Sequence, residues 1–268
     1  MCIVVDILHH YAGRNPKNFV RVGHPLAVVL GLSTSVLLFL VQMLHVAPQL
    51  LSEVLCKLYW ILAIFIMYNI LGNMLACHRA TSSVASLPEE RQVPAAEEKH
   101  LWQHCDLCQK LAPPRSWHCK LCECCILKRD HHCIFTAACI GHNNHRYFFW
   151  FTFYAALGTG MCLVSTFVLL VRNLLVLQLI NFSTFLDTLL FSITLFSWVA
   201  AVIMFAFQIH VVYLNTSYYQ ILDRSYDLGV RSNCRIIMGE RGLWTFLSPS
   251  IKSPLPHDGT KWQLKRST

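Results

Sequence analysis

Charged residues are scarce in this sequence of 268 residues. Only 13% of the residues are charged, whereas 55% are hydrophobic, and the mean hydropathy is +0.46. Soluble globular domains contain about 25% charged residues, so this balance argues against a soluble enzyme. Long stretches of the chain carry no charge at all, which is typical of a protein that crosses a membrane several times.

Four hydrophobic stretches are each long enough to cross a hydrocarbon core of about 30 Å as a helix that rises about 1.5 Å per residue. The sequence predicts these spans at residues 25–46, 58–78, 147–171 and 185–211. We therefore divide the chain into an N-terminal segment (1–24), helices 1 and 2 (25–78), a Pro- and Glu-rich linker (79–99), a Cys-rich module (100–147), helices 3 and 4 (148–211) and a C-terminal tail (212–268).

The surplus of basic residues lies almost entirely outside the predicted spans. Lys and Arg number 22 against 14 Asp and Glu, a formal net charge of +8. Four spans put both termini and the Cys-rich module on one side of the membrane, and that side holds nearly all the basic residues. The positive-inside rule makes that side cytosolic. Membrane orientation explains the surplus of basic residues better than a nucleic-acid-binding surface does, so we expect no nucleic-acid partner.

Cysteine is abundant, with 13 residues, and eight of them lie between residues 105 and 139. In reducing cytosol such a density indicates metal binding rather than disulfides. Two CxxC pairs can each chelate a metal through one tight turn, and zinc takes four N or S ligands. The candidate ligands are sufficient for two zinc sites: Cys105, Cys108, His118, Cys119, Cys122, Cys125, His132 and Cys139.

Three further side chains in this segment form a plausible reaction centre. A thiol nucleophile needs a base, and the base needs a group that orients it. Asp130 can hold His131 in one tautomer, and His131 can take the proton of Cys133. Because neighbouring residues on extended backbone point to opposite faces, His131 can serve the thiol while His132 faces a metal. On spacing alone, the alternative that all of these residues bind metal or pack stays open.

Together these motifs closely resemble the Asp-His-His-Cys (DHHC) family of protein S-acyltransferases, or palmitoyltransferases. The likeness is contiguous from Cys105 to Phe148, and a weaker one follows the fourth span, at residues 225–229 with Asn233 and Gly239. The resemblance implies an all-α membrane protein of four transmembrane helices, with a cytosolic zinc-binding Cys-rich module between helices 2 and 3. It also includes Pro114, Arg115, Cys139-Ile140-Gly141 and Asn144.

The resemblance further implies a site and a reaction. It assigns two structural Zn²⁺ ions in an interleaved order, and Cys133 accepts a long-chain acyl group from acyl-CoA (palmitoyl-CoA) and passes it to membrane-proximal cysteines of substrate proteins. The expected location is the endoplasmic reticulum or Golgi membrane. The interleaved sets are Cys105, Cys108, His118 and Cys125 on one zinc, and Cys119, Cys122, His132 and Cys139 on the other.

Four cations near the motif are candidates for the phosphates of CoA, which basic side chains would hold. The competing explanation for each is positive-inside balance or contact with lipid headgroups. The four are Arg115, Lys128, Arg129 and Arg146.

Two departures from the family pattern keep other functions open. Residues 134–138 read Ile-Phe-Thr-Ala-Ala where the family usually has Pro-Trp-x-Asn-Asn, so Phe135 replaces a tryptophan, and Tyr218 stands where a Thr-Thr-x-Glu motif has glutamate. A weakly active or inactive membrane scaffold is therefore an alternative. A membrane-anchored zinc-binding E3 ligase would leave Asp130, His131 and Cys133 unexplained. A channel or transporter ranks last, because the spans lack charged residues.

Overall fold

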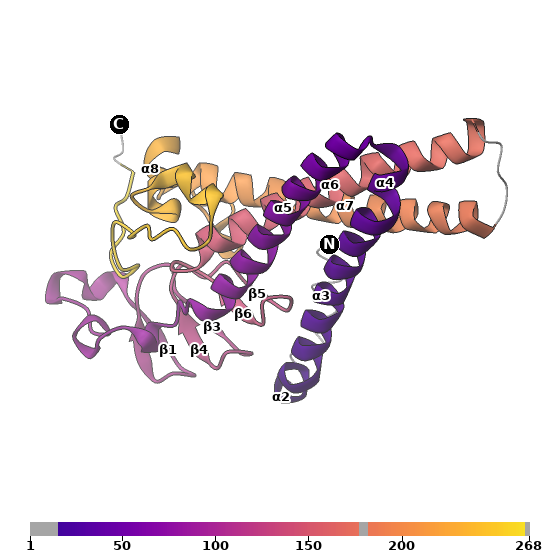
Figure 1. The fold of residues 1–268 in the computed structure, drawn as a ribbon. Helices are drawn as coiled ribbons and strands as arrows, with labels where there is room; N and C mark the ends of the chain where they lie inside the picture. Colours follow the sequence, from indigo (N-terminus) through magenta and orange to yellow (C-terminus); the bar gives the residue numbers. More distant parts are fainter. Residues whose placement is uncertain (1–15, 177–181, 266–268) are drawn as a thin grey trace. The chain divides into compact units, whose positions relative to one another are not determined.

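A computed structural model describes residues 16–176 and 182–265 (Figure 1). The chain separates into two compact units. The module unit comprises residues up to 31, residues 74–148 and the chain from residue 210, and the helix unit comprises residues 32–73 and 149–209. Most of the predicted N-terminal segment, residues 1–15, lies outside the described residues.

Four helices are long and apolar enough to cross a membrane, as the sequence predicts. Each predicted span lies inside one of them. The observed helices extend beyond the predicted spans at their ends, where further residues continue the helical hydrogen bonding. Lipid offers backbone N–H and C=O groups no other hydrogen-bond partners. The helices are Phe19–Leu50, made of η1 (Phe19–Gly23), α3 (His24–Val41), η2 (Gln42–Val46) and α4 (Ala47–Leu50); α5 (Glu53–Arg79); His145–Leu175, made of α6 (His145–Val171) and most of η6 (Arg172–Val176); and α7 (Phe182–Leu214).

Polar side chains join the helices of the helix unit. The hydroxyl of Tyr59 donates to Gln42 Oε1 at 2.9 Å, and that of Ser165 donates to the same oxygen at 2.7 Å. The hydroxyls of Thr166 and Thr194 lie 3.1 Å apart. Hydrogen bonds between polar side chains commonly stabilise the packing of membrane helices. A cavity of about 130 Å³ lies beside Gln42 and Tyr59 and is otherwise lined mainly by apolar side chains of α3, α5 and α6.

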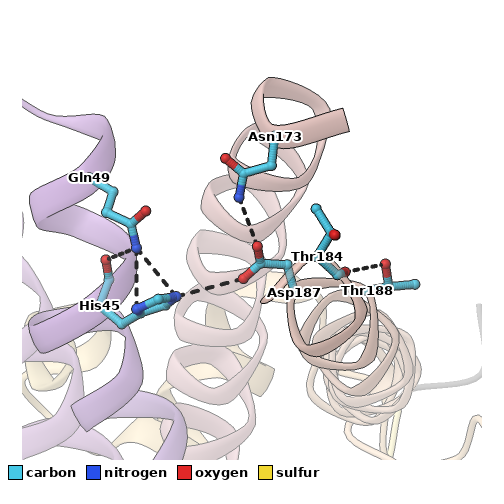
Figure 2. A network of polar contacts seen from close by, with 6 residues as sticks. All are labelled: His45, Gln49, Asn173, Thr184, Asp187 and Thr188. Carbon is cyan, nitrogen blue, oxygen red and sulfur yellow. Dashed lines mark hydrogen bonds and ion pairs between the residues drawn. The ribbon is translucent and has the colours of Figure 1, made fainter. Parts of the chain in front are cut away.

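Asp187 lies inside the fourth predicted span, which corrects the expectation that the predicted spans lack charged residues. Asp187 in α7 is 3% exposed, accepts a 2.8 Å hydrogen bond from Asn173 Nδ2 and has its other oxygen 3.6 Å from His45 Nε2. Figure 2 shows these side chains meeting from three helical segments, with Gln49 on the imidazole of His45. A carboxylate within a span is costly unless it is paired, so these partners explain why Asp187 is tolerated there.

The Cys-rich module consists of three antiparallel hairpins between α5 and α6, which confirms its predicted place between helices 2 and 3. Each strand has only three residues. Hairpins this small have little core of their own. The strands are β1 (Gln103–Cys105) with β2 (Lys110–Ala112), β3 (Trp117–Cys119) with β4 (Cys124–Ile126), and β5 (His131–Cys133) with β6 (Ala138–Ile140).

The predicted linker is partly packed against these hairpins. Ser82 O accepts a 2.8 Å hydrogen bond from Leu127 N, Ser83 forms a β-bridge with Ile126, and Val84 is buried in a small apolar cluster with Leu127 and other residues. Here the apolar side chain of Val84 and the backbone pairing of Ser82 and Ser83 outweigh the loop-forming composition. The start of the segment is therefore a fixed support rather than a free connection.

The C-terminal tail is also folded onto the module unit. It forms η7 (Tyr218–Gln220), α8 (Val230–Met238) and η8 (Gly242–Leu247). The buried amide of Asn233 donates to Tyr213 O at 2.7 Å, in the last turn of α7, and to Asp227 Oδ1 at 2.7 Å. One buried side chain thus ties α8 to the end of the fourth span.

We predict that Asp187→Ala destabilises the protein. The change leaves the Asn173 amide without its acceptor, which costs about 1–3 kcal/mol for a buried group, and thermal unfolding in detergent should shift to a lower temperature. Thr188→Ala is the matched control, because Thr188 is exposed and its hydroxyl bonds the Thr184 carbonyl of its own helix. Equal melting temperatures for the two variants would contradict the role given to Asp187.

Candidate active site and metal centres

The three hairpins share one design. Cys105 pairs with Lys110, Cys119 with Cys124 and Cys133 with Ala138, so the same register recurs every 14 residues. Each turn also contains a residue with positive φ at the same place, at Gln109, Glu123 and Ala137. Cys133 therefore occupies in the third hairpin the position that Cys105 and Cys119 occupy in the first and second.

The first and second hairpins bring four ligand atoms together. Cys105 and Cys108 come from the first hairpin, and His118 and Cys125 come from facing positions of β3 and β4. His118 Nδ1 lies 3.2 Å from Cys108 Sγ and 3.7 Å from Cys105 Sγ, and all four ligand atoms lie within 4.8 Å of one another.

The second and third hairpins repeat this arrangement. Cys119 and Cys122 come from the second hairpin, and His132 and Cys139 face each other across β5 and β6. His132 Nδ1 lies 3.3 to 3.6 Å from the three sulfur atoms. The other nitrogen of His132, Nε2, lies 2.9 Å from His24 Nε2, at the start of α3.

Each group fits a zinc ion. Three thiols and one imidazole supply the four N and S donors of a closed tetrahedral site, and all eight residues are buried or half-buried. The six cysteines among them are free thiols. These are the two interleaved sets that the family resemblance implies. Zinc bound there would hold the short hairpins together, because structural zinc contributes its binding free energy to folding.

The side chain of Asn144 and a close backbone approach at Gly141 position the third hairpin. The Asn144 side chain is fully buried, donates to Cys77 O at 3.1 Å and Cys139 O at 2.9 Å, and accepts from Gly141 N at 2.8 Å. A Cβ on Gly141 would lie 2.5 Å from Leu127 O, so only glycine allows this close approach. One amide therefore joins the end of α5, strand β6 and the residue before α6.

Asp130, His131 and Cys133 stand apart from both ligand groups. Asp130 Oδ2 lies 2.9 Å from His131 Nδ1, and Asp130 Oδ1 accepts a 2.7 Å hydrogen bond from Tyr218 N. This contact uses the backbone of Tyr218 and not its side chain. The ring of Phe148 packs edge-on against the imidazole, with centroids 4.7 Å apart. His131 Nε2 is buried and has no hydrogen-bond partner among the described residues.

The electrostatics of these three groups favour a reactive thiolate. Burial alone would raise the pKa of the Cys133 thiol, but the side chain of His131 lowers it below its usual value. Burial alone would lower the pKa of His131, whereas Asp130 and Cys133 raise it to about 10. For Asp130, the effect of His131 outweighs burial and holds the pKa well below its ordinary value. The proton is thus favoured on the imidazole, which is the arrangement of an activated cysteine nucleophile.

The guanidinium of Arg115 is engaged by contacts within the fold. It is 5% exposed, and it donates to Asn215 O at 2.6 Å and to Gln220 Oε1 at 3.2 Å. Its guanidinium carbon lies 4.2 Å from the ring centroid of Tyr226 and 4.3 Å from that of Trp262. Arg115 therefore holds the tail against the module.

The other three candidate cations are buried as well. Arg129 donates to His118 O at 2.8 Å, Arg146 donates to Ser253 O at 2.7 Å, and Lys128 is 1% exposed. All four cations that the sequence predicts for CoA phosphates, Arg115, Lys128, Arg129 and Arg146, are thus buried, and their role in CoA binding stays a prediction. The sequence could not distinguish solvent-facing cations from cations whose donors bind backbone carbonyls inside the fold.

Sequence reasoning missed two parts of this site. One is His24, a lone histidine far from the Cys-rich module in sequence. The other is the backbone N–H of Tyr218 on Asp130, which carries no side-chain signal. Both contacts span more than 80 residues of chain, and the spacing of residues in one segment does not report them.

We predict that Cys122→Ser lowers the metal content from two zinc ions to one. The hydroxyl is a poor replacement for a thiolate, and only the second group contains Cys122. Elemental analysis of the purified protein gives the stoichiometry. Cys124→Ser is the control, since Cys124 lies in the same hairpin but outside both groups and should retain two ions. Loss of zinc from the control variant would contradict this division of ligands.

We predict that Arg115→Lys destabilises the module unit. A lysine cannot reproduce the planar fork that bonds Asn215 and Gln220 and stacks between two rings. A lower thermal midpoint is therefore expected, on the scale of 1–3 kcal/mol, the cost of leaving buried acceptors unpaired. Arg231→Lys, at an exposed site on α8, is the matched control. A stable Arg115→Lys protein whose only defect is weak CoA binding would contradict this structural role and support the predicted CoA contact.

Comparison with known proteins agrees with this geometry. A model of the DHHC palmitoyltransferase family matches residues 98–225, which contain both ligand groups, the Asp130-His131-His132-Cys133 run and the fourth span. A comparison with curated proteins gives no match. The chain therefore carries a DHHC palmitoyltransferase domain over residues 98–225.

Proposed function

We propose that this protein is a protein S-acyltransferase in which Cys133 carries a long-chain acyl group from acyl-CoA to cysteines of substrate proteins. The observation that carries the proposal is the line of contacts from Tyr218 N through Asp130 to His131, whose imidazole in turn lowers the pKa of the Cys133 thiol. A structural metal module does not require this arrangement, whereas a cysteine nucleophile with an oriented base does.

The chemistry is an exchange of thioesters. The Cys133 thiolate attacks the carbonyl carbon of the acyl-CoA thioester, the C–S bond to CoA breaks, and the CoA thiolate takes the proton held by His131. The acyl-enzyme then reacts with a substrate cysteine, whose proton passes to His131 as the new thioester forms and the Cys133 thiolate leaves. No ATP is needed, because one thioester replaces another. Asp130 keeps the imidazole in the tautomer that presents Nε2 to the sulfur.

The two ligand groups have a structural part in this proposal. Cys105, Cys108, His118 and Cys125 would hold one zinc ion, and Cys119, Cys122, His132 and Cys139 the other. A closed zinc site has no open position for a substrate. His132 and Cys139 would then be held in register across β5 and β6 by the second site, with Cys133 on the face of β5 opposite His132.

The membrane supplies the donor and the acceptors. Each CH₂ of an acyl chain gains about 0.8 kcal/mol on burial in apolar surroundings, which favours long chains such as palmitoyl. By the positive-inside rule the module and termini are cytosolic, where CoA is soluble. Substrates are then proteins with membrane-proximal cysteines, in the endoplasmic reticulum or Golgi.

The test is the intact mass of purified protein after incubation with palmitoyl-CoA. Wild type should gain one acyl group that neutral hydroxylamine removes, and Cys133→Ser should gain none while it keeps two zinc ions. Cys124→Ser should acylate like wild type, because this thiol of the same module is not paired with the Asp130–His131 base. No adduct on folded, zinc-replete wild type over several chain lengths would reject the proposal in favour of a membrane scaffold.

A further inference from the structure

The side chain of His24, which lies outside the Cys-rich module, makes a hydrogen bond to a candidate zinc ligand. His24 is the first residue of α3, is 7% exposed, and belongs to the same compact unit as the hairpins. Its Nε2 lies 2.9 Å from His132 Nε2. The two rings are 21° from parallel, and their centroids are 4.8 Å apart, much farther than the two nitrogens. The rings are therefore stacked with an offset that brings the two Nε2 atoms within hydrogen-bond distance.

The chemistry of the second ligand group sets the direction of this bond. His132 faces the three sulfurs with Nδ1. Coordination through Nδ1 leaves the ring proton on Nε2, which must donate it. His24 Nε2 is then the acceptor, and the proton of His24 lies on its Nδ1. Such partners of metal-bound histidines set the tautomer and the ring orientation of the ligand.

The same helix touches the chain on the other side of the nucleophile. Gly31 lies seven residues, or about two turns, after His24, and so on the same face of α3. A Cβ at Gly31 would lie 3.2 Å from the ring of Phe135, so the absence of a side chain allows this ring to approach the helix. Residues 132 and 135 flank Cys133 closely, and both contact one face of the first span.

We propose that His24 is a positioning residue: it accepts the hydrogen bond of the zinc ligand His132 and thereby holds β5, with Cys133 next along the chain, against the first span. The expected effect of His24 on catalysis rests on the proposed function. The expected effect of His24 on zinc retention does not, since zinc retention can be measured without any acyl donor. The first span is on this view part of the reaction centre and not only a membrane anchor.

Two substitutions separate the hydrogen bond from packing. His24→Phe keeps the ring and loses the acceptor, whereas His24→Gln keeps an acceptor oxygen near the Nε2 position and loses the ring. His45→Phe is the matched control, because His45 lies near the other end of the same span and contacts Asp187. Zinc release from the full-length protein in detergent is followed with a chromogenic chelator.

The proposal expects one of the two zinc ions to leave His24→Phe about 10–100-fold faster than wild type, the usual effect of losing such a partner. The other ion should keep its wild-type rate, and His24→Gln and His45→Phe should release both ions slowly. Wild-type release from a folded His24→Phe protein would overturn the proposal. One fast zinc in His24→Gln would overturn it as well, since packing would then explain the effect.

Where His24→Phe does not fold, His24→Asn replaces it, because an asparagine amide is too short to reach His132, and the same two outcomes apply. Acylation gives the catalytic readout: the rate of acyl-enzyme formation should fall in His24→Phe with the KM for palmitoyl-CoA unchanged, and recover in His24→Gln. An inactive wild type would reject the proposed function alone, and the zinc-release result would still decide the role of His24.

Discussion

Neighbouring hairpins share their metal ligands, and the rest of the module depends on that sharing. Each candidate zinc group takes a CxxC pair from one hairpin and a His and a Cys from the next. Strands of three residues cannot make a core, so the hairpins are stable only when joined. Three hairpins linked in this way make two shared sites. The third hairpin then has a cysteine at the equivalent position, Cys133, with no fourth hairpin to share it.

In this arrangement the third hairpin differs from the other two at the position of Cys133. Thr136 stands in the third turn where Cys108 and Cys122 stand in the first and second, so a second chelating sulfur is missing. Cys133 instead has His131 on the same face of β5, and Asp130 orients that imidazole. The departure from the usual family sequence at residues 134–138 leaves the Asp130–His131 contact in place.

Buried charge joins the module to segments far along the chain. Asp130 accepts from the backbone after the fourth span, Arg115 binds the same stretch and stacks on two aromatic rings, and Arg146 reaches the carbonyl of Ser253. Partners of this kind are needed, because an unpaired buried charge is strongly unfavourable. Together with His24 on His132, they bring the first span, the hairpins and the tail to one centre.

The sequence by itself determined the four spans, the place of the Cys-rich module and the residues with chemistry to offer. Uncharged runs of more than 20 residues are typical of membrane-spanning helices, and the local spacing of CxxC pairs is sufficient to predict a metal site. The Asp130–His131 contact also joins neighbours in the chain. Only the tertiary structure decided which cations face inward, that the segment after α5 and the tail are packed, and that His24 meets a ligand 108 residues away. Such contacts depend on which distant surfaces pack together, and a lone histidine or arginine has the same local pattern in either role.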